Sequence, residues 1–557
     1  MTKTQTFFTG FALLTGIALF QTGCKQAAQT LLPVPDPDHG GLTLTKGFDA
    51  FKVVEELGPA RHLVVADNGD IYVALNNMSK GAGTVALRDT TGDGRADIIS
   101  YFGSVSGTGI QIYGGYLYFG CDTAIVRYPM REGSLVPDED YEIVAGGFPN
   151  ESQHAAKPID FDGEGHLYVN VGAPANACME QMRTKGSPGM DPCPILDYAG
   201  GIWRFDAGTL HQDQLKDGYR YVTGIRNCVA LRWNPIVESL YAVQHGRDQL
   251  NQFFPEMYTV QQSADLPAEE FLKMSDGADF GWPYCYYDPF QEKKVLGPEY
   301  GGDGVTTGRC EQKTDPIMAF PAHTAPNDLL FYTGDQFPER YRGGAFIAFH
   351  GSWNRAPLEQ EGYYVVFVPF RDGLPSGDWE IFADGFKGVD VLMNTGDAEH
   401  RPVGLAMGRD GSLYVSDSRK GTVWRIYYTG DEEALAESKS EKESKEIDVA
   451  DLPGQKVYNV TCLPCHQSDG NGVPGMHPSL RNSEWVNGDK ERLIRIVLEG
   501  LEGEIEVNGE TFKSVMAPLN HLTARQVADV LTFVRKSFGN DASEVTEEEV
   551  EQVKQNL

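Results

Sequence analysis

Hydrophobic and polar positions alternate in short runs that recur along most of the chain. Each run has an apolar stretch, a turn of Gly, Asn or Asp, and a second stretch with Tyr or Phe inside it. The six runs are LVVADNGDIYVAL, IQIYGGYLYFGC, IDFDGEGHLYVNV, LRWNPIVESLYAV, GGAFIAFHGSW and LAMGRDGSLYVSD. Short alternating strands without interleaved amphipathic helices predict an all-β fold, and six repeats about 40 to 50 residues apart predict a six-bladed propeller over residues 47–430.

The repeat is stretched between Gln244 and Gly344, where one blade has to share the chain with long loops. Loops of that length inside a compact domain usually have a function. We therefore expect part of the functional site to come from this interval.

The hydrophobic pattern changes after the last repeat. Residues 431–451 are nearly all charged or small and predict a linker. Beyond them, KERLIRIVLEGLEG and TARQVADVLTFVRKSF place apolar residues three and four positions apart, as amphipathic helices do. We predict a small all-α domain over residues 452–540 and an acidic tail over residues 541–557.

The N-terminus has an apolar run from Phe7 to Phe20, which is too short to span a hydrocarbon core of about 30 Å. Residues 1–24 are therefore predicted to be a signal peptide, followed by a polar tether over residues 25–46. The Gly23-Cys24 step resembles a bacterial lipoprotein signal, although Gln21 departs from the usual aliphatic residue; an ordinary cleaved signal is the alternative. The expected location is exported and lipid-anchored to a bacterial membrane, facing the periplasm or the cell surface.

Net charge excludes one class of partner. The 557 residues include 79 Asp and Glu against 47 Lys and Arg, a formal charge of −32. A nucleic-acid backbone requires a basic face, so nucleic acid is not an expected partner.

Export makes the nine cysteines informative, because an oxidising compartment permits disulfides. Cys178 with Cys193 and Cys285 with Cys310 are close in sequence, and each pair lies in a loop rich in Pro and Gly. Cys24 would carry lipid and Cys462 and Cys465 would carry haem, so Cys121 and Cys228 remain as a third pair, unless they are free buried thiols.

The motif CLPCH near the C-terminus has the spacing of a covalent haem site. Two thiols one turn apart, Cys462 and Cys465, add to the haem vinyl groups, and the adjacent His466 binds the iron. A zinc site is disfavoured because a lone CxxC offers only two thiolates, and no βαβ pattern of a redox CxxC surrounds it. The segment around SVMAPLNHL resembles a class I cytochrome c, which implies Met516 as the second axial ligand; His521 and Met476 are the alternatives. A His/Met iron suits electron transfer.

Several phrases of the propeller region form an ordered set over about 380 residues: PNESQHAAKPIDFDGEGHLYVNVG, YRYVTGIRNCVALRWNP, YAVQHGRDQLNQ, DFGWPYC, FHGSWNR and HRPVGLAMGRDGSLYVSD. Together they resemble the six-bladed sorbosone and pyranose dehydrogenases that use pyrroloquinoline quinone (PQQ), which are distant relatives of soluble quinoprotein glucose dehydrogenases. The resemblance implies an all-β six-bladed propeller followed by a small all-α cytochrome c domain.

The resemblance also implies a set of roles. His154 matches the catalytic base, and Arg226 matches the residue that polarises the reacting carbonyl. Gly246 and Arg247 would offer backbone oxygens to calcium, with Asp248 nearby. The expected cofactor-binding residues are Arg61, Asn227, His350, Trp353, Arg355 and Arg401.

One position departs from the glucose dehydrogenases. Their catalytic histidine is supported by a carboxylate nineteen residues further on, where this chain has Ala173. The sequence therefore leaves the partner of His154 undefined.

A separate loop, DTTGDGRADIIS from Asp89, resembles an EF-hand-type calcium loop. Asp89, Asp93 and Asp97 occupy ligand positions, but Thr91 and Ser100 stand where stronger ligands are usual. A plain Asp/Gly turn is the alternative.

The sequence thus predicts a PQQ-, calcium- and haem c-dependent dehydrogenase of a sugar or related alcohol, which passes electrons to a periplasmic acceptor. An eight-bladed quinoprotein would need repeated Ala/Gly/Trp blade motifs and an adjacent Cys-Cys pair, neither of which is present. The other alternative is a non-catalytic propeller that binds a glycan or a protein and carries an electron-transfer cytochrome.

Overall fold

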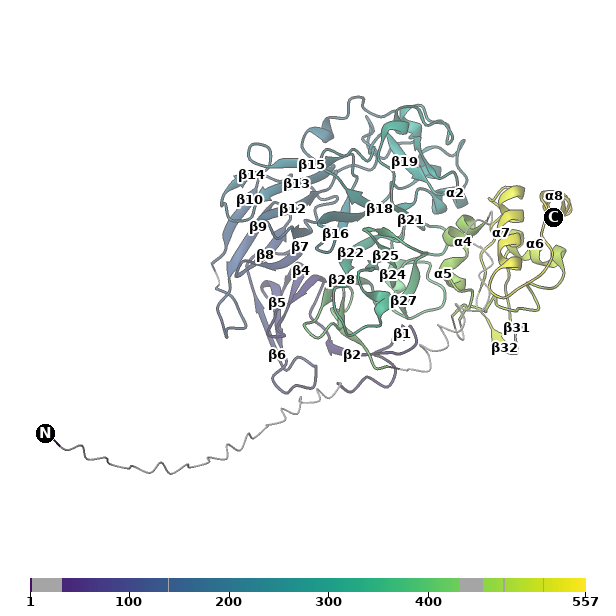
Figure 1. Cartoon of the computed structure of the whole chain (residues 1–557). Helices are drawn as coiled ribbons and strands as arrows, with labels where there is room; N and C mark the ends of the chain where they lie inside the picture. Colours follow the sequence, from purple (N-terminus) through teal and green to yellow (C-terminus); the bar gives the residue numbers. More distant parts are fainter. Residues whose placement is uncertain (3–32, 139, 431–453, 474–475, 514) are drawn as a thin grey trace. The chain divides into compact units, whose positions relative to one another are not determined.

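Six sheets of four or five strands, antiparallel except for one parallel edge pair, make up most of the described chain before Gly430 (Figure 1). The structure, a computed structural model, describes residues 1–2, 33–138, 140–430, 454–473, 476–513 and 515–557. The predicted signal peptide with Cys24, most of the predicted tether and the predicted linker lie outside these residues.

Each sheet is one propeller blade, so the predicted six-bladed propeller is confirmed. The first three blades consist of β3 (Ala60–Val65), β4 (Ile71–Ser79), β5 (Ala82–Arg88) and β6 (Ile98–Phe102); β7 (Gly107–Tyr113), β8 (Tyr116–Cys121), β9 (Ala124–Pro129), β10 (Glu142–Gly146) and β14 (Gln212–Asp213); and β11 (Ile159–Phe161), β12 (His166–Val171), β13 (Gly201–Asp206) and β15 (Tyr219–Thr223).

The last three blades consist of β16 (Cys228–Asn234), β17 (Ser239–Gln244), β18 (Glu269–Met274) and β21 (Met318–Phe320); β22 (Pro326–Phe331), β23 (Ala345–Phe349), β24 (Tyr364–Val368), β27 (Glu380–Asp384) and β1 (Thr43–Leu44); and β28 (Pro402–Met407), β29 (Leu413–Asp417), β30 (Val423–Tyr428) and β2 (Phe48–Val54). Neighbouring blades cover both faces of a sheet, so strands such as β23 and β24 are buried at every position.

The ring is closed by pairing between the two ends of the propeller. Strand β2 runs antiparallel to β30, with Phe48 opposite Tyr428. The Phe48 ring contacts the rings of Phe337, Tyr341 and Phe382 edge to face. Closure completes the last blade and packs its strands β28 and β29 against β3 of the first blade, so that both blades bury their faces.

The stretched interval holds fourth-blade strands and β22 together with inserted elements, as the sequence predicts. These are α1 (Leu250–Phe253), α2 (Val260–Asp265) and the hairpin of β19 (Cys285–Asp288) and β20 (Lys293–Leu296). A smaller hairpin, β25 (Phe370–Arg371) with β26 (Leu374–Pro375), follows β24.

The C-terminal region is mainly helical, as predicted. Its elements are α4 (Gln455–Thr461), α5 (Leu463–His466), α6 (Lys490–Glu499), β31 (Ile505–Val507), β32 (Glu510–Phe512), α7 (Ala524–Lys536) and α8 (Glu547–Lys554). Helix α8 lies within the segment expected as an acidic tail. Thr546 caps it, and Val550 and Val553 pack into the core of the domain with α6 and α7.

Residues from Val34 onward form one compact unit. Tyr458 and Leu463 of the helical region belong to the same hydrophobic cluster as Tyr364 and Trp379 of the fifth blade. The helical domain and the propeller therefore share part of a core.

Two of the three expected disulfides are present, Cys178–Cys193 and Cys285–Cys310. The third pairing is wrong: Cys121 and Cys228 are free, buried thiols. Each is packed among apolar side chains of a different cluster, so both behave as small core residues. Among the described residues, no helix has the length and apolar character that crossing a bilayer requires.

The closure of the ring makes Phe48 a sensitive position. Phe48→Ala should lower the free energy of unfolding of the propeller by about 3–5 kcal/mol, because it removes a buried ring and leaves a cavity. Urea unfolding followed by tryptophan fluorescence measures the loss. Lys52→Ala on the same strand removes only an exposed ion pair to Glu55 and should stay within about 0.5 kcal/mol of the parent. Equal effects of the two substitutions would contradict this account of closure.

Candidate functional site

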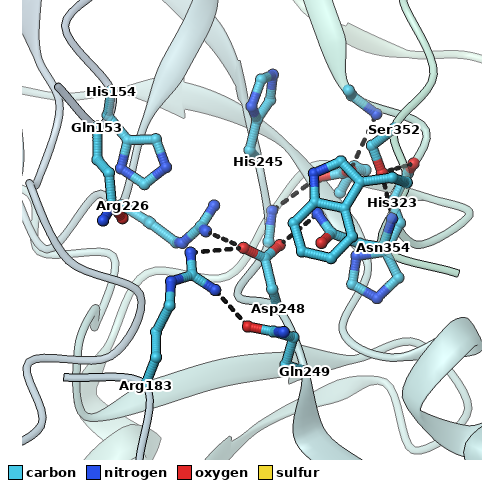
Figure 2. A pocket seen from close by; sticks show the side chains of 14 residues that line it. Gln153, His154, Arg183, Arg226, His245, Asp248, Gln249, His323, Ser352 and Asn354 are labelled. Carbon is cyan, nitrogen blue, oxygen red and sulfur yellow. Dashed lines mark hydrogen bonds and ion pairs between the residues drawn. The ribbon is translucent and has the colours of Figure 1, made fainter. Parts of the chain in front are cut away.

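A cavity of about 450 Å³ opens among the third, fourth and fifth blades and the inserted loops (Figure 2). Its wall contains five residues that the sequence singled out: His154, Arg226, Gly246, Asp248 and Trp353. We call it the front cavity. These residues come from segments up to about 200 positions apart, which the closed ring brings together.

His154 lies between β10 and β11 with its backbone in the left-handed region, at φ 56°. Its Nδ1 is 2.5 Å from the carbonyl oxygen of Ala173. A carbonyl accepts but does not donate, so Nδ1 carries the proton and Nε2 keeps its lone pair. Ala173 stands where the glucose dehydrogenases have the carboxylate that supports the catalytic histidine. In this chain the backbone carbonyl of Ala173 takes that place as the partner of His154.

Close approach of the chain makes this contact possible. A Cβ atom on Gly172 would lie 2.7 Å from Cβ of His154 and 2.6 Å from Oδ1 of Asn227. Only glycine leaves room for both side chains at that point.

The imidazole of His154 is held neutral. Burial, and then the charge of Arg226, lower its pKa to about 3. His245, also in the wall, has its pKa lowered to about 4, chiefly by burial, with the Arg226 charge contributing. His154 and His245 are therefore two uncharged imidazoles near the guanidinium of Arg226.

Arg226 is buried and paired with Asp248, at 2.5 Å between Nη2 and Oδ2. Asn354 donates to the other oxygen of Asp248 at 2.8 Å, and Arg183 approaches the carboxylate at 3.4 Å. The positive neighbours keep the pKa of Asp248 low against the effect of burial. Nε of Arg226 and Oδ1 of Asn354 are buried without a hydrogen-bond partner, so polar capacity remains for a ligand.

Further cations lie beyond His245. Arg61 has its pKa lowered to about 10 by burial and by the charge of Arg401. The two guanidiniums donate to neutral oxygens: Arg61 to Asn76, and Arg401 to the carbonyls of His350 and Gly351. The same charges, together with burial, hold the pKa of His350 well below its usual value. This group therefore has positive charge available for an anion.

The remaining predicted residues have other surroundings. The Arg247 side chain is buried against Glu299 at 2.5 Å, and Asn227 accepts from Asn170 at 3.1 Å. Arg355 points away from the front cavity and lines a second one, described below. Its guanidinium is paired with Asp265 and Glu361.

Four wall residues, His154, Gln249, His323 and Ala325, have positive φ angles of 56°, 65°, 63° and 54°. Such conformations are costly for residues other than glycine and persist where surrounding contacts impose them. Their concentration around one cavity marks it as a built site.

The expected calcium loop is saturated by its own backbone. Asp89 accepts from the N–H groups of Thr91, Gly92 and Gly94, and Asp97 accepts from that of Thr90. Within the described residues, the one group of three metal-capable side chains with converging atoms is Asp162, Glu164 and His166. The structure therefore does not bring Asp89, Asp93 and Asp97 together.

The second cavity, about 200 Å³, is lined by all four predicted haem residues: Cys462, Cys465, His466 and Met516. We call it the haem cavity. The two cysteines are free thiols whose pKa values burial raises to about 11 and 12.

His466 Nδ1 lies 3.0 Å from the carbonyl oxygen of Pro478, which fixes the proton there and leaves the lone pair on Nε2. Met516 is held by bridge pairing with Leu501. Of the alternative ligands, Met476 also lines the haem cavity, whereas His521 lies 3.0 Å from Asp265 and is not in the wall.

Comparison with known proteins agrees with both parts of this geometry. A family model described as TrAA12-like matches residues 42–429. The chain belongs to the TrAA12-like family. A cytochrome c model matches residues 452–537.

Three relatives illustrate the likeness. A segment is 31% identical over 188 residues to the pyrroloquinoline quinone-dependent pyranose dehydrogenase of Coprinopsis cinerea, covering 29% of this chain and 25% of that protein. Another is 37% identical over 101 residues to cytochrome c-552 of Thermus thermophilus, covering 17% of this chain and 67% of that one. The holo PQQ domain of the Coprinopsis cinerea pyranose dehydrogenase has the same fold, with a TM-score of 0.56 and 20% identity over 69% of this chain and 97% of that chain. The chain thus spans a quarter of the length of its curated dehydrogenase relative.

Several residues that line the front cavity were not predicted from the sequence. His245, Gln249, Ser352 and Asn354 lie inside phrases that were quoted for their neighbours. Arg183, Glu269 and His323 stand in none of them, and the stretched interval was the only signal for the last two. Glu269 accepts from the N–H groups of Gly246 and Ala325, and burial raises its pKa to about 7.

The neutral state of His154 can be measured directly. Its imidazole resonances in the cofactor-free protein should not titrate between pH 8 and pH 4, because burial and Arg226 oppose protonation. The unfolded chain takes up this proton near pH 6.5, so His154 lowers the free energy of unfolding as pH falls from about 6.5 to about 3. An inflection of His154 near pH 6.5 would refute the assignment.

Proposed function

We propose that the chain is an exported quinohaemoprotein dehydrogenase. It oxidises a sugar, such as a pyranose or a sorbosone-like aldose or ketose, or a related alcohol or aldehyde, with PQQ in the front cavity. Electrons pass to covalent haem c and then to a periplasmic acceptor. One observation carries the proposal: the wall of the front cavity contains both a neutral His154, whose Nε2 is free, and a buried Arg226. The same chain also has a CxxCH motif.

The front cavity suits PQQ, a tricarboxylate with an ortho-quinone. Arg226, in the wall of this cavity, has a buried Nε donor without a partner. Arg61 and Arg401 are not among the wall residues, and in the contacts described above they bond only to neutral oxygens. Guanidinium groups are the preferred partners of carboxylates. Residues proposed to hold the group are Arg61, Arg226, Asn227, His350, Trp353 and Arg401. Arg355, which the resemblance assigned to the same group, lies in the haem cavity instead.

When bound, PQQ supplies a quinone carbon that accepts hydride, and haem c supplies an iron that takes up single electrons. Nε2 of His154 takes the proton of the substrate hydroxyl, while Nδ1–H stays on the Ala173 carbonyl and orients the ring. Arg226 directs its charge at an oxygen that becomes negative, and Asp248 and Asn354 hold it in place. An anion beside Arg226 offsets the charge that lowers the pKa of His154, so cofactor binding makes the base stronger.

The finer parts of the proposal concern ions and location. Backbone oxygens of Gly246 and Arg247, with Asp248 nearby, are the proposed calcium ligands. Two disulfides favour an oxidising compartment, and a lipid on Cys24 would anchor the protein to a membrane.

His154→Ala should lower the rate of substrate-driven haem reduction by about 10²- to 10⁴-fold, because it removes the proton acceptor. The protein is first loaded with PQQ and calcium, and the haem absorption band is followed after addition of each member of a sugar, alcohol and aldehyde panel. His166→Ala, on the exposed β11–β12 turn, is the matched control and should keep the parent rate. If no panel member reduces the haem and His154→Ala changes nothing, the propeller is a binding module rather than a dehydrogenase.

Met516→Ala should remove the methionine–iron absorption band and lower the haem reduction potential, because a Met/His pair keeps that potential high. Potentiometric titration of the holoprotein measures the change. Met476→Ala, in the same cavity wall, should leave both properties intact. The reverse pattern would make Met476 the ligand.

A further inference from the structure

The front cavity and the haem cavity share two stretches of chain. In residues 321–325, Pro321 and Ala322 line the haem cavity, whereas His323 and Ala325 line the front cavity. In residues 352–355, the first three residues line the front cavity and Arg355 lines the haem cavity. Consecutive Cα atoms are only about 3.8 Å apart, so these two segments form a thin common wall.

The haem domain is held against this wall by specific polar contacts. Asp378, between β26 and β27, accepts from Gln455 Nε2 at 3.0 Å and from Asn459 Nδ2 at 2.6 Å. These two amides stand four residues apart on α4, on one face of the helix. Asp265 of the propeller lies 3.0 Å from His521 of the haem domain.

The centre of the contact is apolar. Tyr458, four residues before the CxxCH motif, and Leu463, inside it, are buried in one cluster with Tyr364 and Trp379 of the fifth blade. An apolar centre with a polar rim is the organisation of a specific interface. The contact therefore has the features of a specific docking interface for the haem domain.

The propeller side also faces the haem cavity with polar groups. The Tyr364 hydroxyl lines that cavity and is buried without a hydrogen-bond partner. Arg355, fixed by Asp265 and Glu361, contributes a guanidinium to the same wall. A hydroxyl and a guanidinium are suitable partners for the carboxylates at the edge of a haem.

We propose that the haem domain is loaded in this docked position, by electron transfer across the wall of residues 321–325 and 352–355, and that Asp378 is the positioning residue that holds α4 there. The inference rests on the proposed function. Substrate oxidation releases two electrons and two protons: a hydride, which carries both electrons and one proton, would pass to the quinone, and the hydroxyl proton leaves on His154. One electron reduces the ferric haem, which passes it to the external acceptor before the second electron follows.

Asp378→Ala in the full-length holoenzyme tests the proposal. Loss of both amide contacts should slow the first-order reduction of haem after mixing with substrate by about 10-fold, because the haem domain then spends less time in the docked position. Reduction of a dye that takes electrons directly from the quinone should stay at the parent rate. Without substrate, hydrogen–deuterium exchange of residues 355–364 and 378–384 should increase.

The control is Asp335→Ala, an exposed carboxylate elsewhere on the propeller, which should change none of the three readouts. Unchanged haem reduction in Asp378→Ala, or a parent rate that grows with protein concentration, would overturn docked loading. If the parent protein reduces no dye with any substrate, the proposed function fails and the loading step with it. The exchange data still decide whether the haem domain docks at Asp378.

Discussion

The pairing of β2 with β30 is the constraint on which the rest of the molecule depends. A propeller blade has two faces to bury and no stability of its own, so six blades are stable only when the last meets the first. Here the first long strand supplies the outer edge of the last blade. Once the ring is closed, the ends of the blades are fixed in space, and residues from three blades and their inserted loops can form one cavity.

Within that cavity, burial has a larger effect on the pKa values of the histidines than the neighbouring charges do. His154 and His245 stay neutral because they are buried and because the charge of Arg226 is near. The ion pair with Asp248 holds the Arg226 guanidinium in place. A backbone carbonyl orients His154, and the nearby carboxylate of Asp248 offsets only part of the effect that burial and Arg226 have on its pKa. The site is therefore biased towards accepting an anionic ligand and weakly basic until that ligand arrives.

The sequence predicted a large share of this structure because its signals are local. Alternating strands, tight turns and the CxxCH spacing each fix structure within a few residues, so six blades, two local disulfides and the haem motif could be read directly. Pairings between distant positions could not. Cys121 and Cys228 each lie in a strand of a different core, and only the folded ring shows that they do not meet.

The direction in which a side chain points was the second feature that could not be predicted from the sequence. Arg355 stands in the same phrase as Trp353, yet one turn of chain sends it to the opposite side of the wall. His154 has a partner that no side-chain pattern encodes, because the acceptor belongs to the backbone. The helix over Glu547–Lys554 was not predicted, because most of its residues are charged or polar. Its two valines, Val550 and Val553, are enough to bury one face in the core of the domain.

The cysteines impose an order on how the protein matures. Four of them are oxidised, as Cys178–Cys193 and Cys285–Cys310, whereas thioether bonds to haem require Cys462 and Cys465 as thiols. The last two are only three positions apart and would themselves form a disulfide under the conditions that join the others. One chain thus needs oxidation at two places and protection from it at a third, so haem attachment competes with disulfide formation for the same thiols.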